Sequence, residues 1–191
     1  MKKLFLAVLG ACTLIAHAAE YDIDLAHSSA TFKIKHLGIS TVTGRFGKFS
    51  GTVDVDPAKL TSLKTSATIE IASVNTDNEK RDTHLKTTDF FDAAKFPQMT
   101  FVSKEVKETG KNKLSISGDL TLHGVTKPVV LDTEFGGELK DPWGKEHVAF
   151  TATTTINRLD FGVGSDEKFP LGGSMLGTEV RIEIQIEALK K

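Results

Sequence analysis

A run of alternating polar and apolar residues near the C-terminus constrains the fold more than any other feature. Residues 179–187 read Glu-Val-Arg-Ile-Glu-Ile-Gln-Ile-Glu, so every second side chain is β-branched and those between are charged or polar. Successive side chains of a strand point to opposite faces, so this pattern predicts a half-buried strand. Similar alternation in seven other segments predicts eight strands in all; these segments are 30–36, 49–55, 67–71, 99–106, 114–122, 129–135 and 148–156.

The connections between these segments are mostly short and rich in turn-forming residues. Asp56-Pro57, Gly110-Lys111-Asn112 and His123-Gly124 are examples. Short turns join antiparallel neighbours, so we expect an all-β antiparallel fold. Closing eight amphipathic strands into a barrel buries their apolar faces and removes the sheet edges, whereas a two-sheet sandwich is the alternative.

One helix is predicted after the third strand. Thr76-Asp77-Asn78-Glu79 has the form of a capping box, with Thr76 as the cap, and it opens a short helix that ends near Lys86. Arg81, His84 and Leu85 stand at positions i, i+3 and i+4 and therefore share one face of this helix.

A second interruption of the strand pattern covers residues 157–177. This stretch is rich in glycine and contains Phe161, Met175 and Leu176. A connection of this length inside a compact domain is typical of a functional lid or a packed surface loop. We expect a lid.

The N-terminus has the features of an export signal. Positive charges at Lys2 and Lys3 precede an apolar run, and Ala16-His17-Ala18 fits a signal peptidase site, so we expect residues 1–18 to be removed after Ala18. The apolar run is too short to span a bilayer. A lipoprotein acylated at Cys12 is the alternative, but Cys12 lies early for that modification. The remaining chain, residues 19–191, is expected to form a single domain.

Composition and spacing exclude several classes of function. Removal of the leader changes the formal charge from −1 to −3, which argues against nucleic acid as a partner. The leader also takes with it Cys12, the one cysteine. The remaining histidines, at positions 27, 36, 84, 123 and 147, lack the spacing of local metal motifs. The sequence therefore predicts no metal site and no cofactor.

Two positions leave a structural and a functional interpretation open. His36 continues the apolar parity of Phe32 and Ile34, so it is expected to point inward at the end of its strand. It is then either a core histidine bonded to a backbone carbonyl or a contact for a ligand headgroup. Likewise Arg81 either pairs with an acid such as Asp89 on a solvated helix or binds an anionic or amide headgroup.

Phenylalanine dominates the aromatic composition, with 12 Phe beside one Trp and one Tyr. Phe rings on the inner faces of strands either fill a solid core or line an apolar tube, because eight-stranded barrels of both kinds exist.

Several ordered motifs together resemble the YceI family. These are Phe32-x-Ile34-x-His36-Leu37-Gly38 with Gly44-x-Phe46, then Arg81-Asp82-x-His84-Leu85 with Asp89-Phe90-Phe91 and Phe96-Pro97, then Gly118-x-Leu120 through Pro128, and Arg158-x-Asp160-Phe161-Gly162. The resemblance covers about residues 21–189.

The resemblance implies a lipocalin-like, extended eight-stranded barrel in the periplasm that holds a polyisoprenoid or another long-chain amphiphile, and it implies no catalytic activity. A monomer and a homodimer are both compatible with it. The implied ligand contacts are His36, Arg81 and His84 at a polar end, with Phe32, Ile34, Phe46, Phe49, Phe90, Phe91, Phe101 and Phe161 along an apolar tunnel.

Two other classes are weighed against a carrier. An outer-membrane barrel requires an outward apolar band and aromatic girdles, which one Trp, one Tyr and charged outer faces do not supply. A periplasmic enzyme acting on a lipid headgroup would use His36 and His84 as acid and base, but no nucleophile or metal motif accompanies them. We therefore expect a binding protein.

Overall fold

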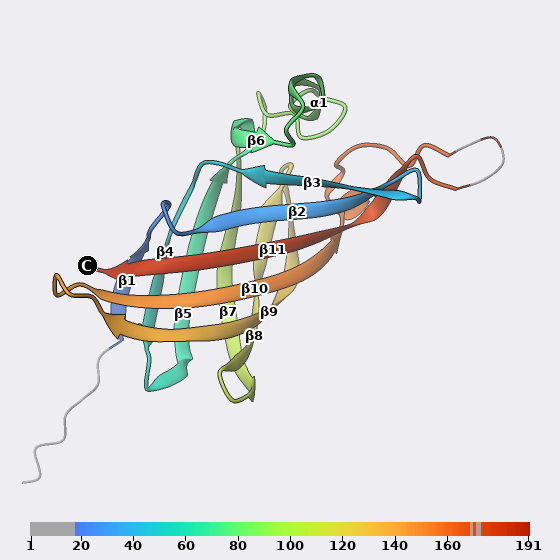
Figure 1. Cartoon of the computed structure of the whole chain (residues 1–191). Helices are drawn as coiled ribbons and strands as arrows, with labels where there is room; N and C mark the ends of the chain where they lie inside the picture. Colours follow the sequence, from blue (N-terminus) through green and yellow to red (C-terminus); the bar gives the residue numbers. More distant parts are fainter. Residues whose placement is uncertain (1–17, 169, 171–172) are drawn as a thin grey trace, which may run out of the picture.

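Antiparallel strands form most of the computed structural model, which describes residues 18–168, 170 and 173–191 (Figure 1). The expected export signal therefore lies outside the described residues, except for Ala18. The elements in chain order are β1 (Ala19–Ile23), β2 (Ser29–His36), β3 (Ser40–Phe46), β4 (Phe49–Asp56), β5 (Lys59–Glu70), the 3₁₀ turn η1 (Ile71–Ser73), β6 (Val74–Asn75), α1 (Glu79–Leu85), β7 (Gln98–Gly110), β8 (Lys113–Leu122), β9 (Val125–Lys140), β10 (Glu146–Asn157), the 3₁₀ turn η2 (Arg158–Phe161) and β11 (Leu176–Lys190).

Eight of the strands form a closed ring in the order β1-β4-β5-β7-β8-β9-β10-β11, and β11 closes it by pairing with β1. This confirms the predicted eight-stranded antiparallel barrel. Closure pairs the backbone groups of strands that a sandwich would leave at sheet edges.

The membership of the ring differs from the expected set of segments. β1 belongs to the ring but was not predicted, whereas the predicted segment 30–36, which is β2, lies beside it. The reason is that β11 is long enough to pair with two strands in turn. Ala188 to Lys190 pair with β1, and Val180 to Gln185 pair with β2.

β2, β3 and β6 extend the barrel wall beyond the ring. β3 pairs with β2 along its length, and its last residues, Arg45 and Phe46, pair with Asn75 and Val74 of β6. Since β6 follows β5 through η1, this pairing connects the extension to the opposite side of the barrel. The short helix α1 follows directly and lies over this end (Figure 1).

Helix α1 begins two residues later than a cap at Thr76 requires. Asn78 is the N-cap, and its side chain accepts a hydrogen bond from the backbone N–H of Arg81. Thr76 does not cap because its hydroxyl donates to Asp82 Oδ1 over 2.5 Å and accepts from Arg81 Nε over 2.8 Å. The helix itself is present, as predicted.

The barrel is packed solid at one end. The end that carries the β1 and β11 termini is filled by Tyr21, Val55, Leu114, Val148 and Ala188, each at most 2% exposed. Burying such side chains stabilises a fold by roughly 1.5–3 kcal/mol for each large apolar group. The core that stabilises the fold therefore lies at this end of the barrel.

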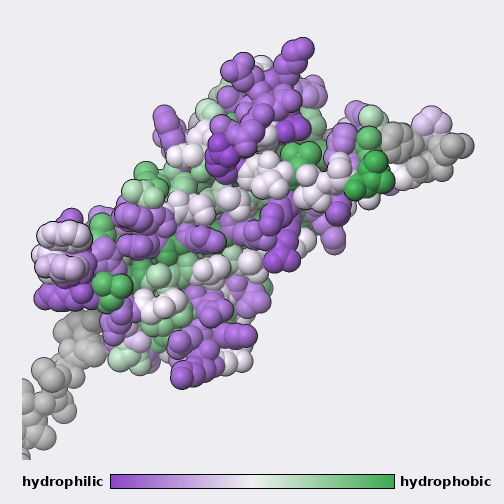
Figure 2. Space-filling view, viewed as in Figure 1, coloured by the Kyte–Doolittle hydropathy of each residue, from purple (hydrophilic) through white to green (hydrophobic). Residues whose placement is uncertain are grey.

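The outer face carries the polar residues of the alternating pattern. Lys33 of β2 donates to both carboxylate oxygens of Glu183 on β11, at 3.0 and 2.9 Å. Figure 2 shows hydrophilic side chains over α1 and across much of the visible outer face. Within the described part of the chain, no helix has the length and apolar character needed to cross a membrane.

Gly44 of β3 gives room to an aromatic ring of the neighbouring strand. It pairs with Phe32 of β2, and a Cβ atom at Gly44 would lie 2.3 Å from Phe32 Cζ. Glycine in a strand often marks such a close approach. A ring therefore occupies the inner-face position that a β3 side chain would otherwise fill.

We expect Gly44→Ala to destabilise the protein by about 1–3 kcal/mol, because the Phe32 ring must move into strained positions. Urea denaturation measures the effect. Gly47→Ala is a matched control, since the nearest atom to its Cβ is Ser73 O at 3.9 Å. Equal destabilisation by both substitutions would contradict the close approach as the cause.

Candidate functional site

A cavity of about 950 Å³ occupies the barrel at the end opposite the filled core. Its volume lies near the upper end of the range of small-molecule sites, roughly 300–1,000 Å³. Aliphatic and aromatic side chains form most of the wall, and they come from the ring strands, from β2 and β3, and from the segments that follow α1 and β10.

β11 shows most clearly that the barrel is hollow here. Val180, Ile182, Ile184 and Ile186 lie on its inner face and line the cavity, yet each remains partly exposed. Ala188, the next inner residue, is fully buried in the filled end. Inner apolar side chains are exposed when no neighbour fills the space before them, so the wall changes from core to cavity along one strand.

Phenylalanine rings form a continuous part of the wall. The Phe32 and Phe46 ring centroids are 5.6 Å apart, and Phe91 meets Phe46 edge-on at 6.0 Å. Aromatic pairs at such separations are favourable beyond the area they bury. Ile34, Phe90 and Phe101 also line the cavity, so six of the eight residues predicted for an apolar tunnel belong to its wall.

Phe49 and Phe161 are buried but do not line the cavity. Phe49 is the first residue of β4 and pairs with Ile69 just after a turn. Phe161 lies in η2, where the chain has left the alternation of β10, and its carbonyl oxygen is 3.3 Å from His123 Nδ1. Both therefore lie outside the cavity wall, and their expected contact with a ligand stays a prediction.

The polar residues predicted for the ligand end all reach one end of the cavity. His36, Arg81 and His84 line it and are also exposed to solvent, so they mark its mouth. His36 is more exposed than a core histidine would be, because β2 ends there and the chain turns outward into the β2–β3 hairpin.

Arg81 and His84 are each held by a neighbour, and the partners differ from those expected. The predicted pair of Arg81 with Asp89 does not form. Arg81 instead donates to the Thr76 hydroxyl and to the Thr76 carbonyl, both at 2.8 Å. Asp89 Oδ2 lies 3.0 Å from His84 Nε2. Thr76 lies just before the helix, where its hydroxyl and carbonyl accept from the Arg81 guanidinium in place of Asp89.

Arg158 is a buried polar residue to which the sequence assigns no role. It is 3% exposed, lies in the cavity wall and donates to the carbonyls of Val163, Ser165 and Gly177 over 2.8–2.9 Å. Burial lowers the pKa of its guanidinium. An arginine has five N–H donors in a fixed planar arrangement and can therefore bind several carbonyls at once. Here these hydrogen bonds connect the two arms of the segment that follows η2.

The segment predicted as a lid forms two antiparallel arms. Lys168 pairs with Ser174, and the Met175 amide donates to Glu167 O over 2.9 Å. Phe169, Leu171 and Gly172 lie outside the described residues. The arms project beyond the β2–β3 hairpin (Figure 1), and their base at Val163 and Met175 lines the cavity mouth. Closure over the mouth stays a prediction.

His147 lies at the filled end between two carboxylates. Its Nε2 is 3.2 Å from Asp141 Oδ2 and its Nδ1 is 2.8 Å from Glu187 Oε1. The hydrogen bonds with Asp141 and then Glu187 raise the pKa of His147 above its ordinary value of 6.5.

We expect the contribution of His147 to stability to depend on pH. A raised folded-state pKa makes this contribution complete below pH 6.5 and removes it as pH rises through the folded-state pKa. Urea denaturation of the protein and of His147→Gln, from about pH 5.5 to about pH 8.5, should show a gap in unfolding free energy that shrinks with rising pH. A gap that widens with pH would contradict the assignment.

A closed barrel with an apolar cavity and polar groups at its mouth has the architecture of barrels that hold one small ligand. The chain belongs to the YceI family, since the model of the YceI-like domain matches residues 21–188. A UPF0312 protein of Shewanella baltica is 42% identical over 195 residues, covering 100% of this chain and 99% of its relative.

Two solved structures share the fold. BcnA of Burkholderia cenocepacia has a TM-score of 0.78 and 30% identity, covering 87% of this chain and 99% of its own. A polyisoprenoid binding domain from Saccharophagus degradans has a TM-score of 0.61 and 14% identity, covering 91% of this chain and 99% of that domain.

Proposed function

We propose that this protein binds one polyisoprenoid or similar long-chain amphiphile, such as an isoprenoid quinone, a prenyl lipid or a fatty amide, and carries it within the barrel. The observation that carries the proposal is the run of half-exposed inner residues on β11, from Val180 to Ile186, which face a cavity of about 950 Å³. Such side chains become buried when an apolar chain occupies the space before them.

The energetics favour a long apolar ligand. Each buried methylene contributes about 0.8 kcal/mol, so burying a chain of roughly 20 carbons contributes about 16 kcal/mol, enough to offset an association cost of roughly 4–15 kcal/mol. The wall offers few polar partners along its length, so affinity would depend on chain length more than on hydrogen bonding. The Saccharophagus degradans domain of the same fold, described as polyisoprenoid binding, supports this class of ligand.

The polar mouth would select the headgroup and orient the ligand. His36, the Arg81 guanidinium and His84 lie together at the solvent-facing end, where a headgroup would remain while the chain extends towards the filled end. Arg81 Nε and Nη2 each donate a hydrogen bond to Thr76, so a headgroup would accept from the remaining N–H groups of the guanidinium.

Export to the periplasm fits this role. The leader pattern of residues 1–18 supports it, and a prenyl chain needs a carrier to cross an aqueous compartment. A barrel that encloses the chain provides such a carrier, and binding rather than catalysis is the activity that we assign to the cavity.

Native mass spectrometry of protein purified without detergent tests the proposal. After incubation with polyprenols of graded length, we expect one ligand per chain and an affinity that rises with length until the cavity is full. A barrel that stays empty, or an affinity independent of chain length, would refute the carrier.

The headgroup contacts are tested separately with the double variant Arg81→Ala, His84→Ala. It should bind a neutral polyprenol as the unmodified protein does, but a polyprenyl phosphate more weakly, because charge-assisted hydrogen bonds are lost. Equal losses for both ligands would indicate damage to the cavity instead of a headgroup site.

A further inference from the structure

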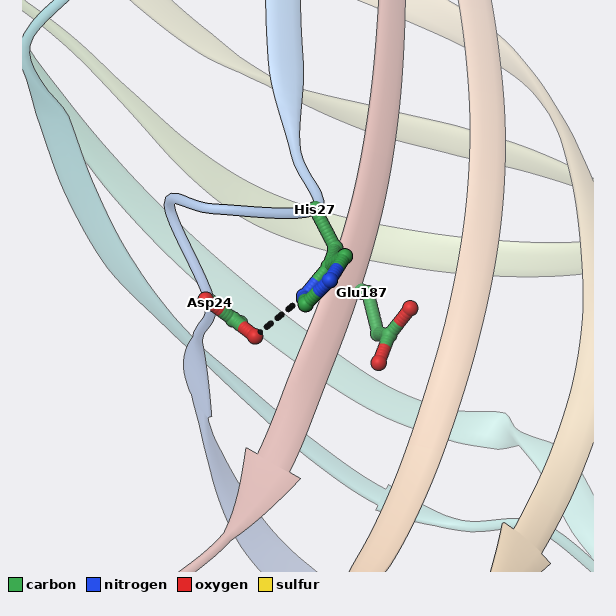
Figure 3. A group of neighbouring side chains, drawn as sticks. All are labelled: Asp24, His27 and Glu187. Atoms are coloured by element: carbon green, nitrogen blue, oxygen red, sulfur yellow. Dashed lines mark hydrogen bonds and ion pairs between the residues drawn. The ribbon is translucent and has the colours of Figure 1, made fainter.

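A second polar cluster lies at the filled end of the barrel, far from the cavity mouth. It joins the turn between β1 and β2 to β11 and comprises Asp24, His27 and Glu187 (Figure 3). One carboxylate or imidazole atom from each residue lies within 4.8 Å of the other two. The spacing of the histidines gives no sign of this cluster, because its members come from opposite ends of the chain.

The turn holds the Asp24 side chain in place. Asp24 Oδ1 accepts from the Ala26 amide over 2.9 Å, while Oδ2 lies 2.8 Å from His27 Nδ1. The Asp24 amide donates to the Glu187 carbonyl over 2.8 Å, and Ser28 Oγ bonds to the same residue's backbone. One Asp24 oxygen is therefore anchored and the other is presented beside the imidazole.

Glu187 is oriented from its other side. His147 Nδ1 lies 2.8 Å from Glu187 Oε1, and Asp141 holds the opposite ring nitrogen of His147. Within the described part of the chain, Glu187 Oε2 makes no hydrogen bond. Histidine and carboxylate partners that fix a metal ligand in this way are typical of metal sites.

We propose that Asp24, His27 and Glu187 form a binding site for one divalent first-row transition-metal ion, of which Zn²⁺ is the representative. Ligand bonds of about 2.0–2.2 Å place neighbouring ligand atoms roughly 3–3.5 Å apart, so modest side-chain rotations gather the three atoms around an ion. An imidazole with two carboxylates favours this class of ion over Mg²⁺ or Ca²⁺, which prefer oxygen ligands alone.

The remaining coordination positions face solvent, because the His27 side chain is 64% exposed. Water would complete the coordination shell. The ion would lie between His27 Nδ1 and Asp24 Oδ2, which are 2.8 Å apart, and would take the place of the hydrogen bond between them. Binding would fasten the β1–β2 turn to β11, at the point where β11 passes from one pairing partner to the next.

Isothermal titration of the untagged protein with Zn²⁺, together with thermal unfolding, tests the site. We expect one ion per chain and a rise in Tm, because a ligand that binds the folded state alone stabilises it. His27→Ala and Glu187→Gln should abolish both effects. Glu146→Gln, which makes the same change of charge on the adjacent strand β10, should retain them.

His147→Gln keeps the three ligands but removes the group that orients Glu187, so Zn²⁺ affinity should fall by about 10–100-fold. Mg²⁺ at the same concentration should leave Tm unchanged. Zn²⁺ binding that survives His27→Ala, an equal Tm shift with Mg²⁺, or no binding by the unmodified protein would each overturn the proposal. Urea unfolding midpoints of the variants establish that they are folded.

Discussion

Ile182→Trp should nearly abolish binding of long-chain ligands while leaving the barrel stable. Ile182 lies in the middle of the β11 cavity wall and is only partly buried, so an indole can extend into open space. If it displaces roughly four methylene groups of a ligand, the loss is about 3 kcal/mol, or roughly 100-fold in affinity. Native mass spectrometry with a polyprenol measures this loss.

The same variant distinguishes a hollow barrel from a filled one. In a well-packed core the added volume would destabilise the protein by about 1–3 kcal/mol, whereas in a cavity the unfolding free energy should change little. Arg181→Trp is the matched control, since it introduces the same side chain one residue away on the outer face. Strong destabilisation by Ile182→Trp alone would mean that the cavity is not available to a ligand.

Arg158→Met should destabilise the protein by about 3–5 kcal/mol, the largest effect that we expect on stability. The substitution preserves an apolar stem but removes the shared donor of the buried Val163 carbonyl and of the more exposed Ser165 and Gly177 carbonyls. A buried acceptor without a partner costs about 1–3 kcal/mol, and the loss of the other two hydrogen bonds adds to this cost. Urea denaturation measures the loss.

Arg158→Lys separates charge from geometry. A lysine carries the charge but cannot donate from a planar fork to carbonyls on two arms, so it should rescue only part of the lost stability. Arg181→Met, at an exposed position, should change the unfolding free energy by less than about 0.5 kcal/mol. If Arg158→Met were equally mild, the guanidinium would not be what connects the arms of the segment.

Strands with strong alternation could be predicted, and β3 shows why others could not. Its inner positions are Val42, Gly44 and Phe46, and the glycine interrupts the apolar pattern. The Phe32 ring of the neighbouring strand fills the space that a side chain at position 44 would occupy. The apolar inner face of β3 is therefore continuous in the structure but interrupted in its sequence. β1 is too short for its pattern to be detected.

The sequence predicts most of the residues that line the cavity, but not which hydrogen bonds they make or where the cavity ends. Alternation and the family motifs indicate which faces point inward, and they lead to the mouth residues His36, Arg81 and His84. They do not distinguish a ring that lines the cavity from one buried beside it, which is why they also select Phe49 and Phe161. The partners of Arg158 are backbone carbonyls. Every residue has a carbonyl, so the sequence does not indicate which of them Arg158 binds.

Because one end of the barrel is packed, the cavity is open at one end only. With Tyr21, Leu114 and Val148 closing the far end, an occupant cannot pass through and must withdraw along the path by which it came. The tail of the ligand that we propose would therefore enter first and leave last. A source and a recipient of such a cargo would have to dock on the same face in succession, and could not engage the molecule together.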